Sequence, residues 1–156
     1  MGIEIERKFL VQHEVWEQLD KPAGKQLKQG YISTDPTKTI RVRIAETKAW
    51  LTIKGISVGA SRLEFEYEIP LIEAEELLDN FSESSLEKIR YEIKSAGKVW
   101  EVDVFSGDNH GLIVAEIELS TEEEYFEKPD WIAEEVTHDK KYYNSNLTKH
   151  PFKNWK

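Results

Sequence analysis

Charged and apolar residues alternate with a period of two through most of this 156-residue chain, and no other feature restricts its fold as much. Such alternation is typical of β-strands, in which successive side chains point to opposite faces of a sheet. The longest run is RLEFEYEI at 62–69. Comparable runs predict further strands at 3–9, 41–44, 51–54, 88–94, 101–104 and 114–119, with a weaker candidate at 26–33.

Turn residues and helical spacing fill the gaps between these runs. A hairpin is predicted at 95–98 and longer loops at 55–61 and 106–111. Because the strands follow one another through turns, the sheet should be mainly antiparallel. Four helices are predicted: a short one around Val15–Leu19, one at 73–81, one that opens at the capping-box pair Ser120 and Glu123 and ends before Pro129, and one at about 139–149.

Composition limits the class of protein. The chain carries 21 Lys and Arg against 30 Asp and Glu, a net charge of −9, which disfavours a nucleic-acid partner. It has no cysteine, so thiolate metal sites and thiol nucleophiles are excluded. Its apolar runs are far too short to cross a membrane, and its N-terminus does not resemble a signal peptide. We therefore expect a cytoplasmic domain of class α+β that spans residues 1–156.

The charged strand faces leave two arrangements open. They face solvent in an ordinary sandwich, or they line the lumen of a closed eight-stranded antiparallel barrel, with helices packed outside. The sorting of the signs favours the lumen, since some strands carry bases (Arg41, Arg43) and others carry acids (Glu116, Glu118). A lumen with so many charges must be wet and paired, because a buried unpaired charge costs several kcal/mol.

The chemistry of such a lumen follows from its side chains. Lys and Arg on rigid strands bind a compact polyanion such as a polyphosphate. Carboxylates without cysteine or clustered histidine select a hard cation, Mg²⁺ or Mn²⁺. Glycine-rich phosphate loops and the common hydrolase and zinc-protease motifs do not occur in the sequence. Phosphate recognition would therefore have to come from side chains.

A motif at the N-terminus, Glu4-x-Glu6-x-Lys8, resembles the signature of the CYTH superfamily, also called triphosphate tunnel metalloenzymes. The remaining motifs follow in that family's order over nearly the whole chain. They are Gln29-Gly30-Tyr31, Arg41-x-Arg43, Thr52-x-Lys54, Glu64-x-Glu66, Glu87-Lys88-x-Arg90-Tyr91, Glu101-x-Asp103, Glu116-x-Glu118 and Glu135-Val136-Thr137-x-Asp139-x-Lys141-Tyr142. Lys141 departs from the pattern, because relatives commonly have Arg there.

The resemblance implies an eight-stranded tunnel, a triphosphate substrate and a divalent metal. The implied phosphate-binding residues are Lys8, Arg41, Arg43, Lys54, Lys88 and Arg90. The implied metal and water ligands are Glu4, Glu6, Glu116 and Glu118, with Glu64, Glu66 and Asp103 as further contributors. The chain most resembles the short bacterial inorganic triphosphatases, in which a Tyr–Lys pair assists hydrolysis. The matching residues are Tyr31 and Lys88, so the implied catalytic residues are Lys88, Tyr31 and Glu6.

The function predicted from these features is metal-dependent hydrolysis of inorganic triphosphate to pyrophosphate and phosphate. Two alternatives stay open. In the first, the tunnel takes another substrate, through hydrolysis of nucleoside or thiamine triphosphate or through ATP cyclisation as in class IV adenylyl cyclases. In the second, it is a polyphosphate-binding module without catalysis. The expected partner is a small-molecule polyphosphate, with neither nucleic acid nor membrane, and a homodimer is left open.

Overall fold

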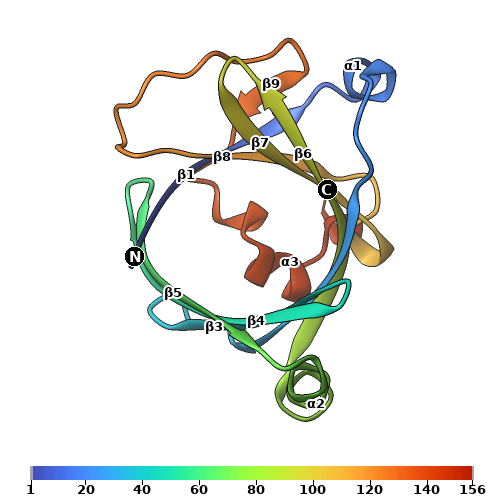
Figure 1. Ribbon diagram of the computed structural model, residues 1–156, viewed down its shortest axis with the longest axis vertical. Helices are drawn as coiled ribbons and strands as arrows, with labels where there is room; N and C mark the ends of the chain where they lie inside the picture. Colours follow the sequence, from blue (N-terminus) through green and yellow to red (C-terminus); the bar gives the residue numbers. More distant parts are fainter. Residues whose placement is uncertain (1, 156) are drawn as a thin grey trace.

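The computed structural model describes residues 2–155 and forms a closed antiparallel β-barrel (Figure 1). The predicted alternating runs lie in strands except for Leu119, which follows the end of its strand, and the weaker candidate at 26–33 is confirmed as a full strand. The strands are β1 (Ile3–Val11), β2 (Lys25–Ser33), β3 (Thr39–Ala45), β4 (Lys48–Val58), β5 (Ser61–Ile69), β6 (Ser84–Ser95), β7 (Lys98–Phe105), β8 (Ile113–Glu118) and β9 (Ile132–Glu135).

Eight of these strands close the barrel in the order β5-β4-β3-β2-β6-β7-β8-β1, and β1 returns to pair with β5. The closing register places Ile3 opposite Leu63 and Glu4 opposite Arg62. The short β9 pairs with the end of β1 beyond this ring. Closure leaves little free sheet edge and fixes which face of every strand points inward.

The charged faces point inward and the apolar faces point outward, so the predicted inverted barrel is confirmed. Glu4, Glu6 and Lys8 of β1 face the lumen, whereas the alternating Phe9 is fully buried against the outside of the wall. The largest apolar cluster packs on the outer surface of β1, β7 and β8. It contains Phe9, Val11, Trp16, Ile93, Trp100, Val102, Ile113, Ala115, Ile117, Leu119 and Trp131.

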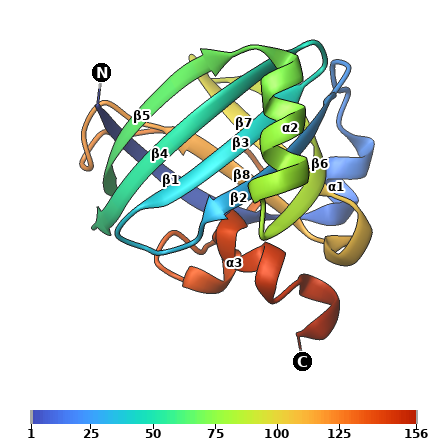
Figure 2. The same cartoon turned by 90° about the horizontal axis from the view of Figure 1, so that it is seen from below.

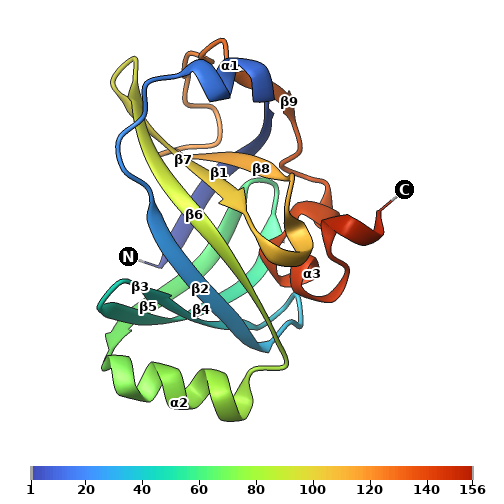
Figure 3. The same ribbon diagram turned by 90° about the vertical axis from the view of Figure 1, so that its right-hand side faces the viewer.

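The helices cover the outside and one end of the barrel. They are α1 (His13–Gln18), α2 (Leu71–Phe81) and α3 (Asn144–Lys149), with 3₁₀ turns η1 (Gly107–Asn109), η2 (Lys140–Tyr142) and η3 (Phe152–Asn154). Figures 1 and 2 show α2 against the outer wall and α3 across one mouth of the tunnel. Figure 3 shows α1 at the opposite side of the barrel from α2. No helix in residues 2–155 has both the length and the apolar character of a membrane span.

Glycine at position 30 lets α2 lie directly on β2. A Cβ atom there would come within 2.7 Å of the Leu78 side chain and 2.4 Å of the Ser82 hydroxyl. Because the outer face of β2 is fitted so closely to α2 and the residues after it, the flanking Gln29 and Tyr31 are held on the lumen side.

Three sequence expectations need correction. The capping box at Ser120 does not open a helix: one turn forms, in which Ser120 N–H donates to Glu124 at 2.6 Å, and the chain then extends so that Phe126 packs on Phe9 and Trp100. The loop at 55–61 is instead a tight hairpin, since β4 continues to Val58. The helix predicted at 139–149 is broken into η2 and α3.

Candidate active site

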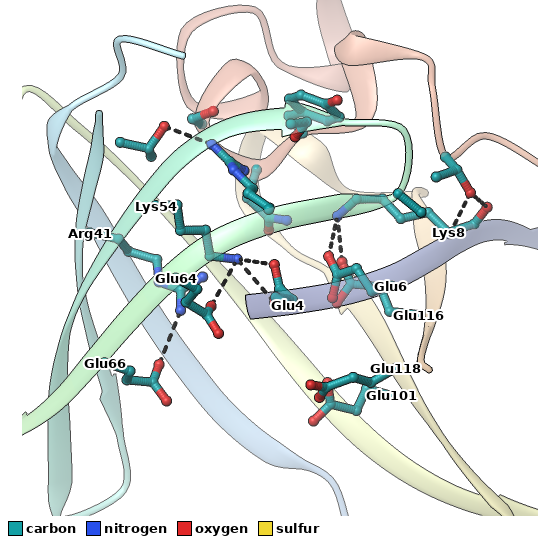
Figure 4. A pocket seen from close by; sticks show the side chains of 18 of the residues that line it. Glu4, Glu6, Lys8, Arg41, Lys54, Glu64, Glu66, Glu101, Glu116 and Glu118 are labelled. Carbon is teal, nitrogen blue, oxygen red and sulfur yellow. Dashed lines mark hydrogen bonds and ion pairs between the residues drawn. The ribbon is translucent and has the colours of Figure 1, made fainter. Parts of the chain in front are cut away.

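The lumen contains a cavity of about 210 Å³ lined by charged side chains from opposite sides of the barrel (Figure 4). Almost every residue predicted for the site lines it. These are Glu4, Glu6, Lys8, Tyr31, Arg41, Arg43, Lys54, Glu64, Glu66, Lys88, Arg90, Glu116 and Glu118. Asp103 belongs to the predicted set but does not line the cavity, because it lies behind Lys88 and Arg90.

The β1–β8 side of the cavity is organised around Lys8. Its ammonium group lies 2.6 Å from Glu116 and 3.4 Å from Glu6, and Lys8 and Glu116 are direct partners in the β-ladder. Burial alone would lower the pKa of Lys8, but Glu116 and Glu6 outweigh it and the pKa is raised. Burial likewise opposes ionisation of Glu116, yet Lys8 holds its pKa down at about 2. Both groups are therefore charged at neutral pH.

Asp103 on β7 anchors two bases of β6. Arg90 donates to both of its carboxylate oxygens, at 2.8 and 2.9 Å, and the Lys88 amine lies 2.7 Å from one of them. Lys88 and Asp103 are 0% and 1% exposed. Burial lowers the pKa of Lys88 to about 7, since Arg90 and Arg43 add to the burial effect and the attraction of Asp103 only partly offsets it. Burial would raise the pKa of Asp103, but Arg90 and Lys88 keep it well below its usual range.

A residue of the C-terminal segment also holds Lys88. The Asn144 side-chain oxygen, at the start of α3, accepts from the Lys88 amine at 2.9 Å. A neutral amine that donates its two hydrogens to Asp103 and Asn144 keeps its lone pair for a proton. The resemblance implied a Tyr31–Lys88 pair, but the hydrogen-bond partner of Tyr31 that the described residues provide is Gln29, at 2.9 Å.

The opposite wall, made by β3, β4 and β5, carries a second set of ion pairs, in which the Glu64 and Glu66 side chains are partly exposed. Lys54 lies between Glu4, at 3.1 Å, and Glu64, at 3.3 Å. Arg41 contacts Glu66 at 3.5 Å, and the Glu66 side chain is 41% exposed. Figure 4 shows these three carboxylates around the tips of Lys54 and Arg41. This wall therefore adds the cations Lys54 and Arg41 to the lining of the cavity.

Two arginines are poorly satisfied by protein partners. The buried Arg41 Nε has no hydrogen-bond partner among the described residues. Arg43 donates to the neutral Gln29 side chain at 3.1 Å, and burial, with help from Arg41 and Arg90, lowers its pKa to about 9. Buried guanidinium groups without a full set of acceptors favour an anionic ligand, because leaving their donors unpaired costs energy.

On the acidic side of the lumen, carboxylates lie close together without enough cations to offset their mutual repulsion. Burial, followed by repulsion from Glu116, raises the pKa of Glu6, and burial followed by repulsion from Glu4 raises the pKa of Glu118. Burial also raises the pKa of Glu101, against the attraction of Arg90. Oxygen-only donors with unrelieved repulsion fit a hard divalent cation. Within residues 2–155, no three Asp, Glu or His side chains are already arranged around one metal position. The carboxylates therefore suit a metal ion through their oxygen donors and through their placement on adjoining strands.

Several cavity residues were not among the predicted site residues. Glu101 and Arg62 were placed in the lumen by alternation but given no role, although Arg62 was expected at a solvated strand end. Thr137, Tyr143, Asn144 and Ser145 arrive from the C-terminal segment. The motif from Glu135 to Tyr142 marked this segment, but nothing in its residue types indicated that it reaches the tunnel.

Known proteins resemble this chain over nearly its full length. An inorganic triphosphatase of Acetivibrio thermocellus is 52% identical over 157 aligned positions, covering 100% of this chain and 99% of that protein. An inorganic triphosphatase of Nitrosomonas europaea is 38% identical, covering 92% and 95%. A crystal structure of an inorganic triphosphatase superposes with a TM-score of 0.64 at 33% identity, covering 92% and 96% of the two chains. The sequence model of the CYTH domain matches residues 2–151, and the chain therefore belongs to the CYTH family.

Proposed function

We propose that this protein hydrolyses inorganic triphosphate to pyrophosphate and phosphate inside its tunnel. The observation that carries the proposal is that one cavity is lined both by under-satisfied arginines and by mutually repelling carboxylates. A polyphosphate that carries a divalent cation complements both halves at once. The names of the relatives at 52% and 38% identity support the same activity.

The bases would hold the phosphate chain. Arg41, Arg43, Lys54, Lys88, Arg90 and Lys8 are the proposed phosphate ligands. Arg43 and Arg41 are the strongest candidates, because a phosphate oxygen would satisfy donors that the protein leaves open. Arg90 and Lys8 are already held by carboxylates, so they would act chiefly through their charge.

The carboxylates would hold the metal. Glu4, Glu6, Glu116 and Glu118 are the proposed ligands, with Glu64 and Glu66 as further contributors, and the metal is Mg²⁺ or Mn²⁺. When bound, a divalent cation supplies charge neutralisation and Lewis-acid activation of a phosphoryl group. We assign Asp103 to holding Lys88 and Arg90 instead, because both of its oxygens face them.

The proposed catalytic residues are Lys88, Tyr31 and Glu6. Glu6 would position a water in line with a terminal phosphorus. As the water oxygen bonds to phosphorus, its proton passes to the Lys88 amine, and the pyrophosphate oxygen leaves with the electrons of the broken P–O bond. Bases around the leaving group stabilise the charge that develops on it. Tyr31 lines the same cavity and would contribute a hydrogen bond.

The cavity size favours an inorganic substrate over a nucleotide. Its volume of about 210 Å³ is below the roughly 300–1,000 Å³ of pockets that enclose drug-sized ligands.

We also propose that the protein is located in the cytoplasm. A homodimer of this protein would leave the tunnel mouths open. Size-exclusion chromatography with light scattering measures the assembly state.

A substrate panel tests the proposal. Phosphate release would be measured from inorganic triphosphate, ATP and thiamine triphosphate with Mg²⁺ or Mn²⁺, and the ATP products would be checked for cyclic AMP. We expect inorganic triphosphate to be the best substrate. Glu6→Ala and Lys88→Ala should slow it by roughly 100-fold or more, while Lys94→Ala, an exposed base on the same strand as Lys88, should not. Undiminished rates in both tunnel variants, or preferred turnover of ATP to cyclic AMP, would contradict the proposal.

A further inference from the structure

Three side chains form a hydrogen-bonded row on the lumen side of β2 and β3. Arg43 Nε donates to the Gln29 side-chain oxygen at 3.1 Å, and the Gln29 side-chain nitrogen donates to the Tyr31 hydroxyl at 2.9 Å. Gln29 is 0% exposed and Tyr31 is 3% exposed. Gln29 and Arg43 are direct partners in the β-ladder, so backbone pairing sets their separation.

The chemistry of arginine determines which atoms donate and which accept in the hydrogen bonds of this row. A guanidinium group has hydrogen-bond donors and no acceptor, so Gln29 must present its carbonyl oxygen to Arg43. The Gln29 NH₂ group then faces Tyr31, and the phenol oxygen accepts from it. The Tyr31 hydroxyl hydrogen must therefore point to another acceptor, and the hydroxyl belongs to a side chain that lines the cavity together with Arg43 and Lys88.

We infer that Gln29 is a positioning residue, which aims the Tyr31 hydroxyl hydrogen at a phosphate oxygen of the substrate. The inference rests on the proposed function and deepens it, because it assigns Tyr31 as a donor to substrate in place of a partner of Lys88. In this role Tyr31 only donates a hydrogen bond, so no bond to its hydrogen breaks. Gln29 contacts no reacting atom, and it acts through Tyr31 and through the orientation of Arg43.

A variant that reverses the direction of the hydrogen bond between residue 29 and Tyr31 tests this role. In Gln29→Glu the carboxylate still accepts from Arg43 but also accepts from Tyr31, which turns the hydroxyl hydrogen away from the tunnel. A donor to a charged oxygen is worth roughly a 10- to 100-fold change, so kcat for inorganic triphosphate should fall by about that factor, as in Tyr31→Phe. The added charge beside Arg43 should weaken substrate binding and raise KM in any background.

The decisive comparison is the effect of Gln29→Glu on kcat with and without the hydroxyl. In the Tyr31→Phe background, we expect Gln29→Glu to raise KM but to change kcat by less than about threefold, because no hydroxyl remains to be misdirected. Gln26→Glu adds the same charge on the same strand at an exposed position and should leave kcat within about twofold. An equal loss of kcat in both backgrounds, or no loss from Tyr31→Phe, would overturn the inference.

Gln29→Leu provides the same test if the buried carboxylate of the Gln29→Glu variant prevents folding, as judged by the thermal unfolding midpoint. It removes both hydrogen bonds at similar volume, and its kcat loss should again vanish in the Tyr31→Phe background. The result is separable from the proposed function. If the wild type does not hydrolyse triphosphate, the function fails, whereas an active wild type with equal losses in both backgrounds refutes the role of Gln29 alone.

Discussion

Individual side chains in the tunnel differ in how completely the protein satisfies them. Lys8 and Arg90 are matched by carboxylates at 2.6 to 2.9 Å, so their charges are fixed parts of the wall. Arg43 has a neutral partner and Arg41 keeps one donor open. Lys88 differs from all of these, because burial lowers its pKa to about 7 despite the neighbouring Asp103. These differences match the roles proposed for the groups, which are fixed charge, phosphate binding and proton uptake.

The pH dependence of the rate should report Lys88. Below a pKa of about 7 the amine is protonated and cannot accept a proton from water, and above it the lone pair is free. We therefore expect kcat to rise with pH through about 7 and then level off. Lys88→Arg should lose this rise, because a guanidinium group stays protonated. A wild-type kcat that falls as pH increases through 7 would rule out this role.

Asp103 should be a major contributor to stability. Asp103→Asn removes the carboxylate that binds the Arg90 guanidinium and the buried Lys88 amine, and breaking similar buried pairs costs about 3–5 kcal/mol. Asp108→Asn is a matched control, since its pair with Lys153 has side chains that are 66% and 58% exposed, and such pairs contribute about 0–1 kcal/mol. Urea unfolding measures both free energies. Equal losses for the two variants would show that Asp103 does not hold the β6 bases.

At the scale of elements, strands build the tunnel wall and the C-terminal segment completes it. Backbone pairing between β6 and β7 places Arg90 opposite Asp103, and pairing between β1 and β8 places Lys8 opposite Glu116. The short α3 lies across one mouth, where Figures 1 and 2 agree on its place, and it supplies Asn144 to Lys88. A helix remote in sequence therefore takes part in placing a central base.

Asn144→Ala should impair the reaction through Lys88. Loss of the acceptor frees one amine hydrogen and lets the side chain rotate, so we expect kcat to fall by roughly 10-fold. Asn146→Ala removes a hydrogen bond to the Lys140 carbonyl in the same segment without touching the tunnel, and it should leave kcat within about twofold. Steady-state kinetics compares the two. Similar kcat values for both variants would assign Asn144 to the structure of α3 alone.

The sequence predicts the strands well because alternation shows which residues share one face of a strand, although it left open which face points into the barrel. The register of 62–69 and of 114–119 correctly places Glu64, Glu66, Glu116 and Glu118 in the lumen. The four-residue β9 is too short for alternation to reveal, and aromatic packing of Phe126 outweighs the helix signal at Ser120. Gln29 was part of a predicted motif but received no role, and Asn144 was not singled out, because neutral amides gain a role only through the neighbours that the fold provides.

At the scale of the whole molecule, the barrel is inverted: its apolar packing lies outside the wall and its charges lie inside. Trp100, Phe9 and Trp131 pack between the outer wall and the segments around it, at ring-centroid distances of 5.6 to 5.8 Å. This outer packing stabilises the fold and leaves the lumen free to hold charges that repel one another. Ligand binding should relieve that repulsion and stabilise the entire barrel.

Triphosphate without added metal, so that it is not hydrolysed during the measurement, should therefore raise the thermal unfolding midpoint. A ligand at 100 times its Kd adds about 2.7 kcal/mol, which corresponds to a shift of roughly 5–10 °C for a domain of this size. Arg43→Ala should reduce the shift at the same ligand concentration. Scanning calorimetry measures the midpoint, and an identical shift for Arg43→Ala and wild type would place the ligand outside the tunnel.

The most direct measurement of the central claim is a ³¹P NMR time course of inorganic triphosphate with the wild-type protein and Mg²⁺ or Mn²⁺. Attack of water on a terminal phosphorus predicts that triphosphate signals decay while one pyrophosphate and one phosphate appear together in equal amounts. An unchanged triphosphate spectrum, or the release of phosphate without accumulating pyrophosphate, would contradict the account.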